Sequence, residues 1–227
     1  MAKTDKKIFF INWFLWHQEE WFAKALKIFC SKKNIEFYTF DFPGHREKKW
    51  NLLNVEEMVE LCWQNLQKLS NYKNYIILWH SQGWTIATRL VYDNKLDNEL
   101  ILAAPSFNIG WLPDRRLSSE ELTILEKGDK LVKDFWRERL FTIDNDFVHA
   151  YKNFLPKNFE PALSNKVTII QAGNDPVISA DSIKLSKNYY LQPQIHIIEW
   201  ANHTFLPKSA REQTFTFIEK IINNEQW

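Results

Sequence analysis

With 227 residues, the chain is long enough for one well-packed domain with a small insertion and too short for two full domains. Hydrophobic residues make up 45% and charged residues 25%, a balance typical of folded globular proteins and not of disordered ones. The net charge of +1 offers no electrostatic basis for general nucleic-acid binding, and two cysteines are too few for a disulfide framework.

The chain begins MAKTDKKIFFINWFLWHQ, in which lysines precede an apolar run as they do in a secretion signal. However, Asn12 interrupts the run, no small-residue cleavage site follows, and the run is too short to cross a bilayer. We therefore expect Ile8–Asn12 to form the first core strand of a cytoplasmic protein without a membrane partner.

Short apolar runs then alternate with longer segments in which apolar residues recur with helical spacing. The expected strands are apolar on both faces, like parallel strands covered by helices: Ile8–Asn12, Glu36–Asp41, Tyr75–Trp79, Leu100–Ala103, Val167–Gln171 and Ile195–Glu199. The expected helices carry apolar residues at positions i, i+3 and i+4: Trp21–Phe29, Val55–Leu69, Thr85–Asp93 and Arg211–Asn223. This alternation predicts an α/β fold with a doubly wound, mostly parallel sheet.

The alternation is interrupted between residues 106 and 165. The segments SSEELTILEKG, LVKDFWRERL and DFVHAYKNFL have helical character, and no strand is expected among them. Ser118 or Ser119 is expected to cap the first segment, and Gly128 to end it. Because the insertion leaves the sheet after one strand and returns before the next, we predict a helical lid over residues 106–165 within a single domain, 1–227.

The segment Tyr75–Trp84 (YIILWHSQGW) contains the central motif. An apolar strand runs into Ser81 and a helical segment follows, which is the context of a nucleophile elbow that raises a serine hydroxyl above the carboxyl edge of a sheet. Gly83 would let the helix pack closely against the strand. The alternative is a serine in an ordinary strand-to-helix turn, since Trp79 stands where an elbow usually has glycine.

Two further residues follow later strands. VTIIQAGNDPVIS places Asp175 in a turn, and IHIIEWANHTFLP places His203 in a loop. Taken alone, GNDP is favourable turn chemistry, and a lone histidine is usually structural. Taken together in the order Ser…Asp…His, each after a strand, they predict a triad: Ser81 as nucleophile, His203 as general base and Asp175 as the acid that orients the base.

Acyl transfer also needs N–H donors for the oxyanion of the tetrahedral intermediate. The backbone N–H of Gln82, the residue after the nucleophile, is expected to be one donor. The other is expected in the loop after the first strand, around Trp13 and Phe14.

Together, WHSQG, GNDPVIS, NHTF and DFPGH (Asp41–His45) resemble the α/β-hydrolase superfamily over essentially the whole chain. The resemblance assigns the second oxyanion donor to the Phe14 N–H, because Asn12-Trp13-Phe14 stands in the place of the superfamily's His-Gly-x loop. Trp13 and Trp79 are large where the superfamily has small residues, which implies that they compensate for one another or reshape the acyl pocket.

Within the superfamily, IFFINWFLWHQEEW and LILAAPSF (Leu100–Phe107) are most similar to the carboxylesterases that cleave pimeloyl-[acyl carrier protein] methyl ester in biotin synthesis. The resemblance implies a monomeric esterase without cofactor, and a methyl ester on a carrier-bound acyl chain that is cleaved through acyl-Ser81. The histidines lack the spacing of metal ligands, so no metal site is expected. A thioesterase or another esterase or lactonase with this triad, and an inactive binding protein of the same fold, remain alternatives.

Residues near the pocket and in the insertion are the candidate substrate contacts. Aromatic side chains that could line an acyl channel are Trp13, Phe107, Trp111, Phe135, Phe141 and Phe147. Cations that could receive an acidic acyl carrier protein are Arg115, Arg116, Arg137 and Arg139. Ordinary packing and a solvated surface of mixed charge are the alternatives, because glutamates and aspartates are interleaved with these cations.

Overall fold

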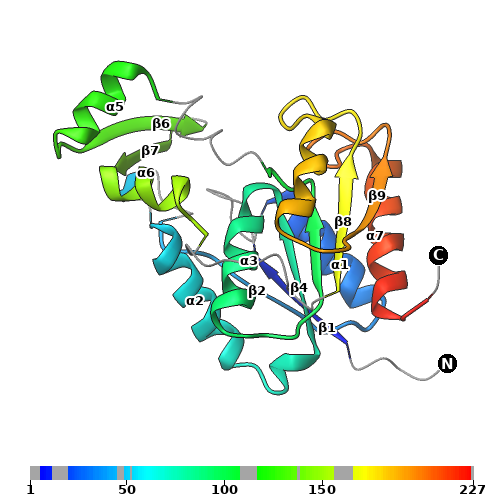
Figure 1. Ribbon diagram of the computed structural model, residues 1–227. Coiled ribbons are helices and arrows are strands. Elements are labelled where there is room, and N and C mark those ends of the chain that lie inside the picture. Colours follow the sequence, from blue (N-terminus) through cyan, green and yellow to red (C-terminus); the bar gives the residue numbers. More distant parts are fainter. Residues whose placement is uncertain are drawn as a thin grey trace.

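The protein is built around a six-stranded sheet in which every strand is parallel to its neighbours (Figure 1). The computed structural model describes residues 6–11, 20–44, 49–51, 53–107, 117–136, 139–155 and 166–225. The strands, in spatial order, are β2 (Phe37–Phe40), β1 (Lys7–Ile11), β4 (Tyr75–His80), β5 (Leu100–Ala103), β8 (Val167–Ala172) and β9 (Gln194–Ile198). All six predicted strands are therefore confirmed, and so is the doubly wound α/β fold.

Helices cover both faces of this sheet: α1 (Trp21–Lys32), α2 (Val55–Gln67), α3 (Trp84–Asp93) and α7 (Lys208–Ile222). Successive strand residues point to opposite faces. On β4, Ile76 and Leu78 pack in one core cluster with α1 and α7, whereas Ile77 and Trp79 pack in another with α2 and α3. Because its side chains alternate between the two faces, the all-apolar strand β4 contributes residues to two separate hydrophobic cores.

The outermost strand β9 is an exception to the prediction of strands buried on both faces. Ile195 and Ile197 are 43% and 45% exposed, while Ile198 is buried with α7. The prediction is wrong here because β9 lies at the sheet edge, where only the α7 face is fully covered.

Two helix starts follow from capping side chains. Asn54 accepts from the Glu57 backbone N–H at 2.9 Å before α2, while the Glu57 carboxylate accepts from the Asn54 N–H at 2.8 Å. Ser118 and Glu121 form the same reciprocal pair before α5 (Ser119–Glu126). Each pair satisfies two backbone donors that a helix start leaves free, which confirms Ser118 as the predicted cap.

The insertion is only partly helical, and the predicted helix over LVKDFWRERL is wrong. After α5 come strands β6 (Leu131–Trp136) and β7 (Arg139–Ile143), an antiparallel pair, and then α6 (Asn145–Lys152). Phe141 and Ile143 are buried while Leu140 is 42% exposed, which is a period of two and not of 3.6.

A short strand far away in the chain completes this second sheet. β3 (Lys49–Asn51) pairs in parallel with β7, so the order is β3-β7-β6. The predicted insertion is therefore not a self-contained unit, because it recruits a strand from the segment before α2. Figure 1 shows α5, β6, β7 and α6 lying together to one side, beyond the N-terminal end of α2. That this unit acts as a lid stays a prediction.

Both cysteines are buried and free. Burial raises the pKa of the Cys30 thiol to about 12, so that thiol is neutral and unreactive near neutral pH. None of the helices described here has the length and apolar character needed to cross a membrane.

Candidate active site

Ser81 lies at a sharp turn between the central strand β4 and helix α3. The strand ends at His80, Ser81–Gly83 form one tight helical turn, and α3 begins at Trp84. Ser81 has φ = 57°, in the left-handed region that residues other than glycine rarely adopt. Its backbone conformation costs on the order of 1–3 kcal/mol, and such strained residues concentrate at functional sites. The backbone thus has the strand, sharp turn and helix that the predicted elbow requires, and the role of Ser81 as a nucleophile stays a prediction.

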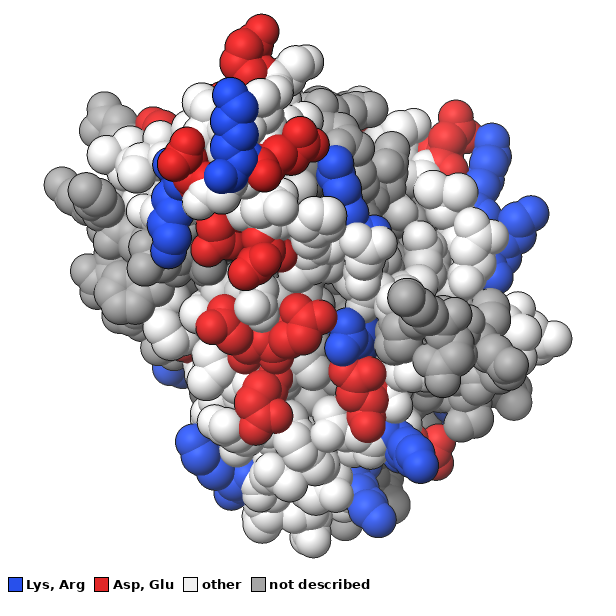
Figure 2. Space-filling model, turned by 60° about the vertical axis from the view of Figure 1, so that its left-hand side comes forward, with Lys and Arg blue, Asp and Glu red and all other residues white. Residues whose placement is uncertain are grey.

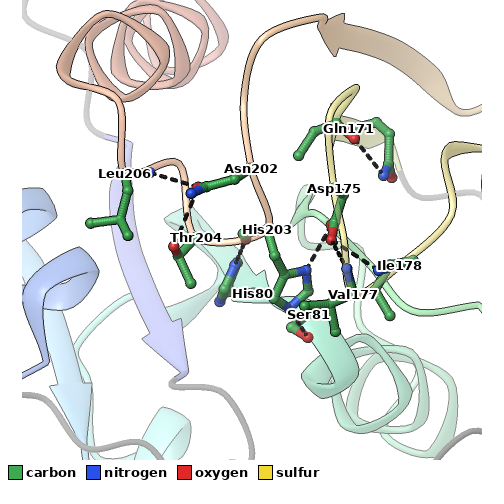
Figure 3. Close-up of polar contacts among 11 residues, drawn as sticks. His80, Ser81, Gln171, Asp175, Val177, Ile178, Asn202, His203, Thr204 and Leu206 are labelled. Carbon is green, nitrogen blue, oxygen red and sulfur yellow. Dashed lines mark hydrogen bonds and ion pairs between the residues drawn. The ribbon is translucent and has the colours of Figure 1, made fainter.

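The three residues of the predicted triad meet in one hydrogen-bonded chain (Figure 3). The Ser81 Oγ lies 2.8 Å from His203 Nε2, and His203 Nδ1 lies 2.7 Å from the Asp175 Oδ2. A carboxylate can only accept, so Nδ1–H donates to Asp175 and the Nε2 lone pair accepts the Ser81 hydroxyl proton. This arrangement is the one in which imidazole can act as a base toward serine.

The acid of this chain is itself held by the backbone. The second carboxylate oxygen of Asp175, Oδ1, accepts from the N–H groups of Val177 and Ile178 at 2.8 and 2.9 Å. The Asp175 side chain is 0% exposed. Its carboxylate therefore cannot turn away from His203 without breaking two hydrogen bonds inside the protein.

Gly173 allows the two loops that carry Asp175 and His203 to lie against each other. A Cβ on residue 173 would stand 2.7 Å from the Cα of Glu199, directly after β9, and that backbone cannot move aside cheaply. The loops are joined by backbone hydrogen bonds from Gly173 to Ile198 and from Asn174 to Ala201, both 3.0 Å. From the sequence, GNDP indicates only a turn. The structure shows that its glycine also lets this turn lie close to the loop after β9.

Trp79, two residues before the nucleophile, fills the space that Gly83 leaves empty. Its Nε1 lies 0.9 Å from the place where a Cβ on residue 83 would stand, and its ring stacks on Phe42. Gly83 has φ = −62°, which any residue can adopt, so it is needed for space and not for its torsion angle. A bulky Trp79 is therefore compatible with the elbow because residue 83 has no side chain.

His80, directly before the nucleophile, makes a contact that the sequence does not specify. It is buried beside the nucleophile, and its Nε2 lies 2.8 Å from the backbone carbonyl oxygen of His203. Burial, together with the neighbouring His203, lowers the pKa of His80 to about 3, so its ring is neutral near pH 7. No local pattern could reveal this contact, since the partner is 123 residues away.

Of the two predicted oxyanion donors, the structure describes one, Gln82. Gln82 lies in the first turn after the nucleophile, where backbone N–H groups have no partner within the helix. Trp13 and Phe14, the predicted source of the second donor, lie outside the described residues. Among the described side chains, both amide atoms of Gln82, the Trp79 Nε1 and the Ser106 Oγ are buried without a hydrogen-bond partner. Buried polar groups of this kind ordinarily bind water or a ligand.

Comparisons with known proteins agree with this fold, although no protein-family model matches the chain. Alpha/beta hydrolase domain-containing protein 10 from mouse superposes with a TM-score of 0.76 at 16% identity, over 98% of this chain and 92% of that one. Est1E from Butyrivibrio proteoclasticus, solved with ferulic acid bound, superposes with a TM-score of 0.72 at 14% identity, over 98% and 90%. The chain has the α/β-hydrolase fold.

A sequence relative is also known from Mycoplasma pneumoniae, a protein named as an esterase/lipase. The two are 30% identical over an alignment of 164 residues that covers 68% of this chain. The chain spans 58% of the length of that relative.

In this α/β-hydrolase fold, the described aromatic candidates for substrate contact are core residues. Phe107, Phe141 and Phe147 are 1%, 0% and 2% exposed and belong to the main hydrophobic cluster. Phe107 packs on Trp84 and stacks on Tyr189. Their placement matches the packing alternative. Trp111 and the side chain of Phe135 lie outside what the structure describes.

The predicted basic docking patch is not visible in the described part of the α/β-hydrolase fold. Arg115, Arg116, Arg137 and the side chain of Arg139 lie outside it. Of the described lysines of the insertion, Lys133 pairs with Glu121 at 2.6 Å. Figure 2 shows acidic side chains gathered down the middle of the face that it draws, with lysine and arginine side chains among and beside them. Among the described residues, no group of three His, Cys, Asp or Glu side chains could hold a metal ion.

Proposed function

We propose that the protein is a serine hydrolase that cleaves carboxylic esters through an acyl-Ser81 intermediate. The observation that carries this proposal is the chain of two hydrogen bonds, 2.8 and 2.7 Å, that joins Ser81, His203 and Asp175 from the ends of three strands. The proposal is supported by the esterase/lipase name of the Mycoplasma relative and by the likeness to Est1E.

In the first half-reaction, His203 Nε2 removes the Ser81 hydroxyl proton as Oγ attacks the acyl carbon of the ester. The oxygen that becomes negative is stabilised by backbone N–H donors, of which Gln82 supplies one. Asp175 stabilises the imidazolium that forms. Nε2–H then gives its proton to the alcohol oxygen, the C–O bond breaks, and the alcohol leaves an acyl-Ser81 ester.

In the second half-reaction, water takes the place of the serine. His203 removes a proton from water as its oxygen attacks the acyl carbon, and the same proton returns to Ser81 Oγ when the acyl bond breaks. The products are an alcohol and a carboxylic acid, and the triad is restored. No cofactor is required for this sequence of steps.

The finer proposal is that the ester is a methyl ester of an acyl chain held by acyl carrier protein, as in pimeloyl-[acyl carrier protein] methyl ester. This proposal is supported by the resemblance of the first strand and of Leu100–Phe107 to the carboxylesterases of biotin synthesis. The acidic side chains in the middle of the face drawn in Figure 2 weaken this proposal, because they would repel an acidic carrier protein from that part of the surface. The proposed esterase reaction is therefore supported by the geometry of the triad, whereas the proposed carrier-protein substrate is supported only by the sequence resemblance.

An active-site probe tests the general proposal. A fluorophosphonate should label the folded protein at Ser81, and Ser81→Ala and His203→Ala should abolish labelling and lower kcat for p-nitrophenyl esters by on the order of 10⁶-fold. Ser70→Ala, at an exposed serine in the turn after α2, is the matched control and should label normally. A folded wild-type protein that neither labels nor hydrolyses would overturn the proposal in favour of a binding protein.

The substrate is tested separately. Purified pimeloyl-[acyl carrier protein] methyl ester is compared with the free methyl ester of the same acid and with acyl thioesters. Faster cleavage of the carrier-bound ester, with growth of a biotin auxotroph lacking this esterase restored by wild type and not by Ser81→Ala, is the expected result. A preference for thioesters would point to a thioesterase, and growth with both versions would discard the pathway.

A further inference from the structure

We propose that His80 is a positioning residue, which holds the loop of the general base at a set distance from the nucleophile. This inference rests on the proposed hydrolase function, since it concerns the Ser81–His203 pair. His80 is not assigned any proton transfer with substrate: the group it touches is the His203 backbone.

The geometry links the two ends of the proposed proton transfer through one residue. His80 is the last residue of β4 and directly precedes Ser81, so the strand fixes both. From there its Nε2 reaches 2.8 Å to the carbonyl oxygen of His203 (Figure 3). The nucleophile and the backbone of the base are therefore connected by one peptide unit, one side chain and one hydrogen bond.

The hydrogen bond has a defined direction. A carbonyl oxygen can only accept, so His80 must carry its proton on Nε2 and donate it. Burial keeps the ring neutral, as its lowered pKa indicates. Neutrality matters because the His203 ring lies 5.2 Å away between centroids and becomes positive during each half-reaction. A charged ring at position 80 would oppose that step, whereas a neutral donor does not.

The ring of His80 is clamped on its other sides. It stacks on Phe22 of α1 at 5.3 Å with an interplanar angle of 19°, and Phe205 of the base loop lies 6.2 Å away. A ring held between a helix and this loop has little freedom to turn. It can therefore act as a rigid spacer, because side chains packed at interior density transmit displacements.

The loop that His80 holds is short and bent. It runs from β9 to α7, and Phe205 within it has φ = 51°, a conformation rare for residues with a side chain. Neighbouring positions have their own ties, from the Leu206 N–H to the Asn202 Oδ1 and from the Asn174 N–H to the Ala201 carbonyl. At the base, Asp175 holds the His203 ring and the His80 donor binds the His203 backbone carbonyl. Without the His80 donor, the imidazole would sample positions farther from Ser81, and misplacement by 1 Å can cost about 10²-fold in rate.

Two substitutions separate the donor from the ring. His80→Phe keeps an aromatic ring against Phe22 but has no donor, whereas His80→Gln loses the ring but places an amide N–H where Nε2 stands. We expect His80→Phe to lower kcat and the fluorophosphonate labelling rate about 10- to 100-fold with KM changed less than about twofold. His80→Gln should recover most of the loss, to within about fivefold of wild type.

His196→Phe is the matched control, because His196 on β9 is stacked on Phe217, away from the triad. It should retain the wild-type kcat. If His80→Phe fails to fold, His80→Asn replaces it: the shorter amide cannot reach the carbonyl, so it should fall well below His80→Gln. The proposal would be overturned by a wild-type kcat in folded His80→Phe. It would also be overturned if His80→Gln lowered kcat as much as the variant without a donor at the Nε2 position, His80→Phe or His80→Asn.

Hydrogen–deuterium exchange gives a measurement that does not depend on catalysis. Backbone amides of residues 200–206 should exchange faster in His80→Phe than in wild type, with His80→Gln in between. Unchanged exchange would contradict the tether even if activity fell. A wild-type protein that is inactive toward every ester would sink the proposed function, while this exchange experiment would still decide whether His80 holds the loop.

Discussion

At the scale of single residues, the two oxygens of Asp175 have separate tasks. Oδ1 is bound by two backbone N–H groups, and Oδ2 alone meets the imidazole. This division lets the fold hold the carboxylate in place without using the oxygen that orients His203. It also means that the charge and the anchoring of Asp175 can be tested independently.

Asp175→Asn should separate the charge of this side chain from its anchoring by the backbone. The amide oxygen can still accept from Val177 and Ile178, so the free energy of unfolding should change little. The amide nitrogen would donate toward His203 Nδ1, which forces the ring proton onto Nε2 and removes the acceptor for Ser81. By analogy with the serine-protease triad, kcat should fall about 10⁴-fold. Steady-state kinetics and urea unfolding check both halves, and a loss below about tenfold would contradict the tautomer argument.

His80 should make the protein sensitive to acid. Its pKa is 6.5 when unfolded and about 3 in the folded protein, so below pH 6.5 the unfolded chain binds a proton that the folded one does not. Above pH 6.5 the ring is neutral in both states, and its titration leaves the free energy of unfolding unchanged. Between pH 6.5 and about 3, acidification lowers that free energy by about 1.4 kcal/mol per pH unit.

Urea unfolding of wild type and His80→Gln at pH 7, 5 and 4 measures this effect. The variant should lose less free energy of unfolding between pH 7 and pH 4 than wild type loses, because glutamine does not titrate. Parallel losses in the two proteins would show that another group dominates the acid response.

At the scale of elements, the carboxyl edge of the sheet depends on two glycines that leave room for a neighbour. Gly83 makes room for the indole of Trp79 under the start of α3, and Gly173 makes room for the backbone directly after β9. The neighbour of Gly83 is a rigid side chain and the neighbour of Gly173 is backbone, so we expect different outcomes when each glycine is replaced by alanine.

Gly83→Ala should destabilise the protein by about 1–3 kcal/mol or more, because the new methyl group overlaps the indole. In a Trp79→Gly background the same substitution should cost close to nothing, since the overlapping ring is gone. Thermal unfolding of the two single variants and the double variant forms a cycle that measures this coupling. Additive losses would mean that Trp79 is not the obstacle.

Gly173→Ala has no such rescue, because its Cβ meets the backbone of Glu199. The turn that carries Asp175 should move away from the base loop, and kcat should fall along with stability. Asn174→Ala, at the neighbouring turn position, is the control and should preserve kcat, since its backbone N–H bond to Ala201 remains. Wild-type kcat in Gly173→Ala would show that the loops tolerate separation.

At the scale of the whole molecule, the insertion and the sheet share a core. Phe141 of β7 and Phe147 of α6 belong to the same cluster as Phe9 and Ile77 of the central strands. A unit joined in this way should unfold together with the body of the protein and not as a separate lid.

Phe141→Ala distinguishes packing from substrate contact. As a core residue, Phe141 should contribute about 3–5 kcal/mol to the free energy of unfolding, lost in a single transition seen by both circular dichroism and tryptophan fluorescence. KM for short esters should be unchanged. Unfolding in two transitions would mean that the insertion is independent, and a raised KM with normal stability would restore its predicted role in an acyl channel.

The sequence by itself determined the six-stranded sheet, the helices that cover it and the order Ser81, Asp175, His203, because these follow from local periodicity and from motifs at strand ends. Tertiary structure alone decided the rest. LVKDFWRERL contributes to two antiparallel strands, the second of which pairs with Lys49–Asn51 far away in the chain, and only folding brings the carbonyl of His203 within 2.8 Å of His80. A local pattern records which face of an element is apolar, but not which distant backbone will come to lie against it.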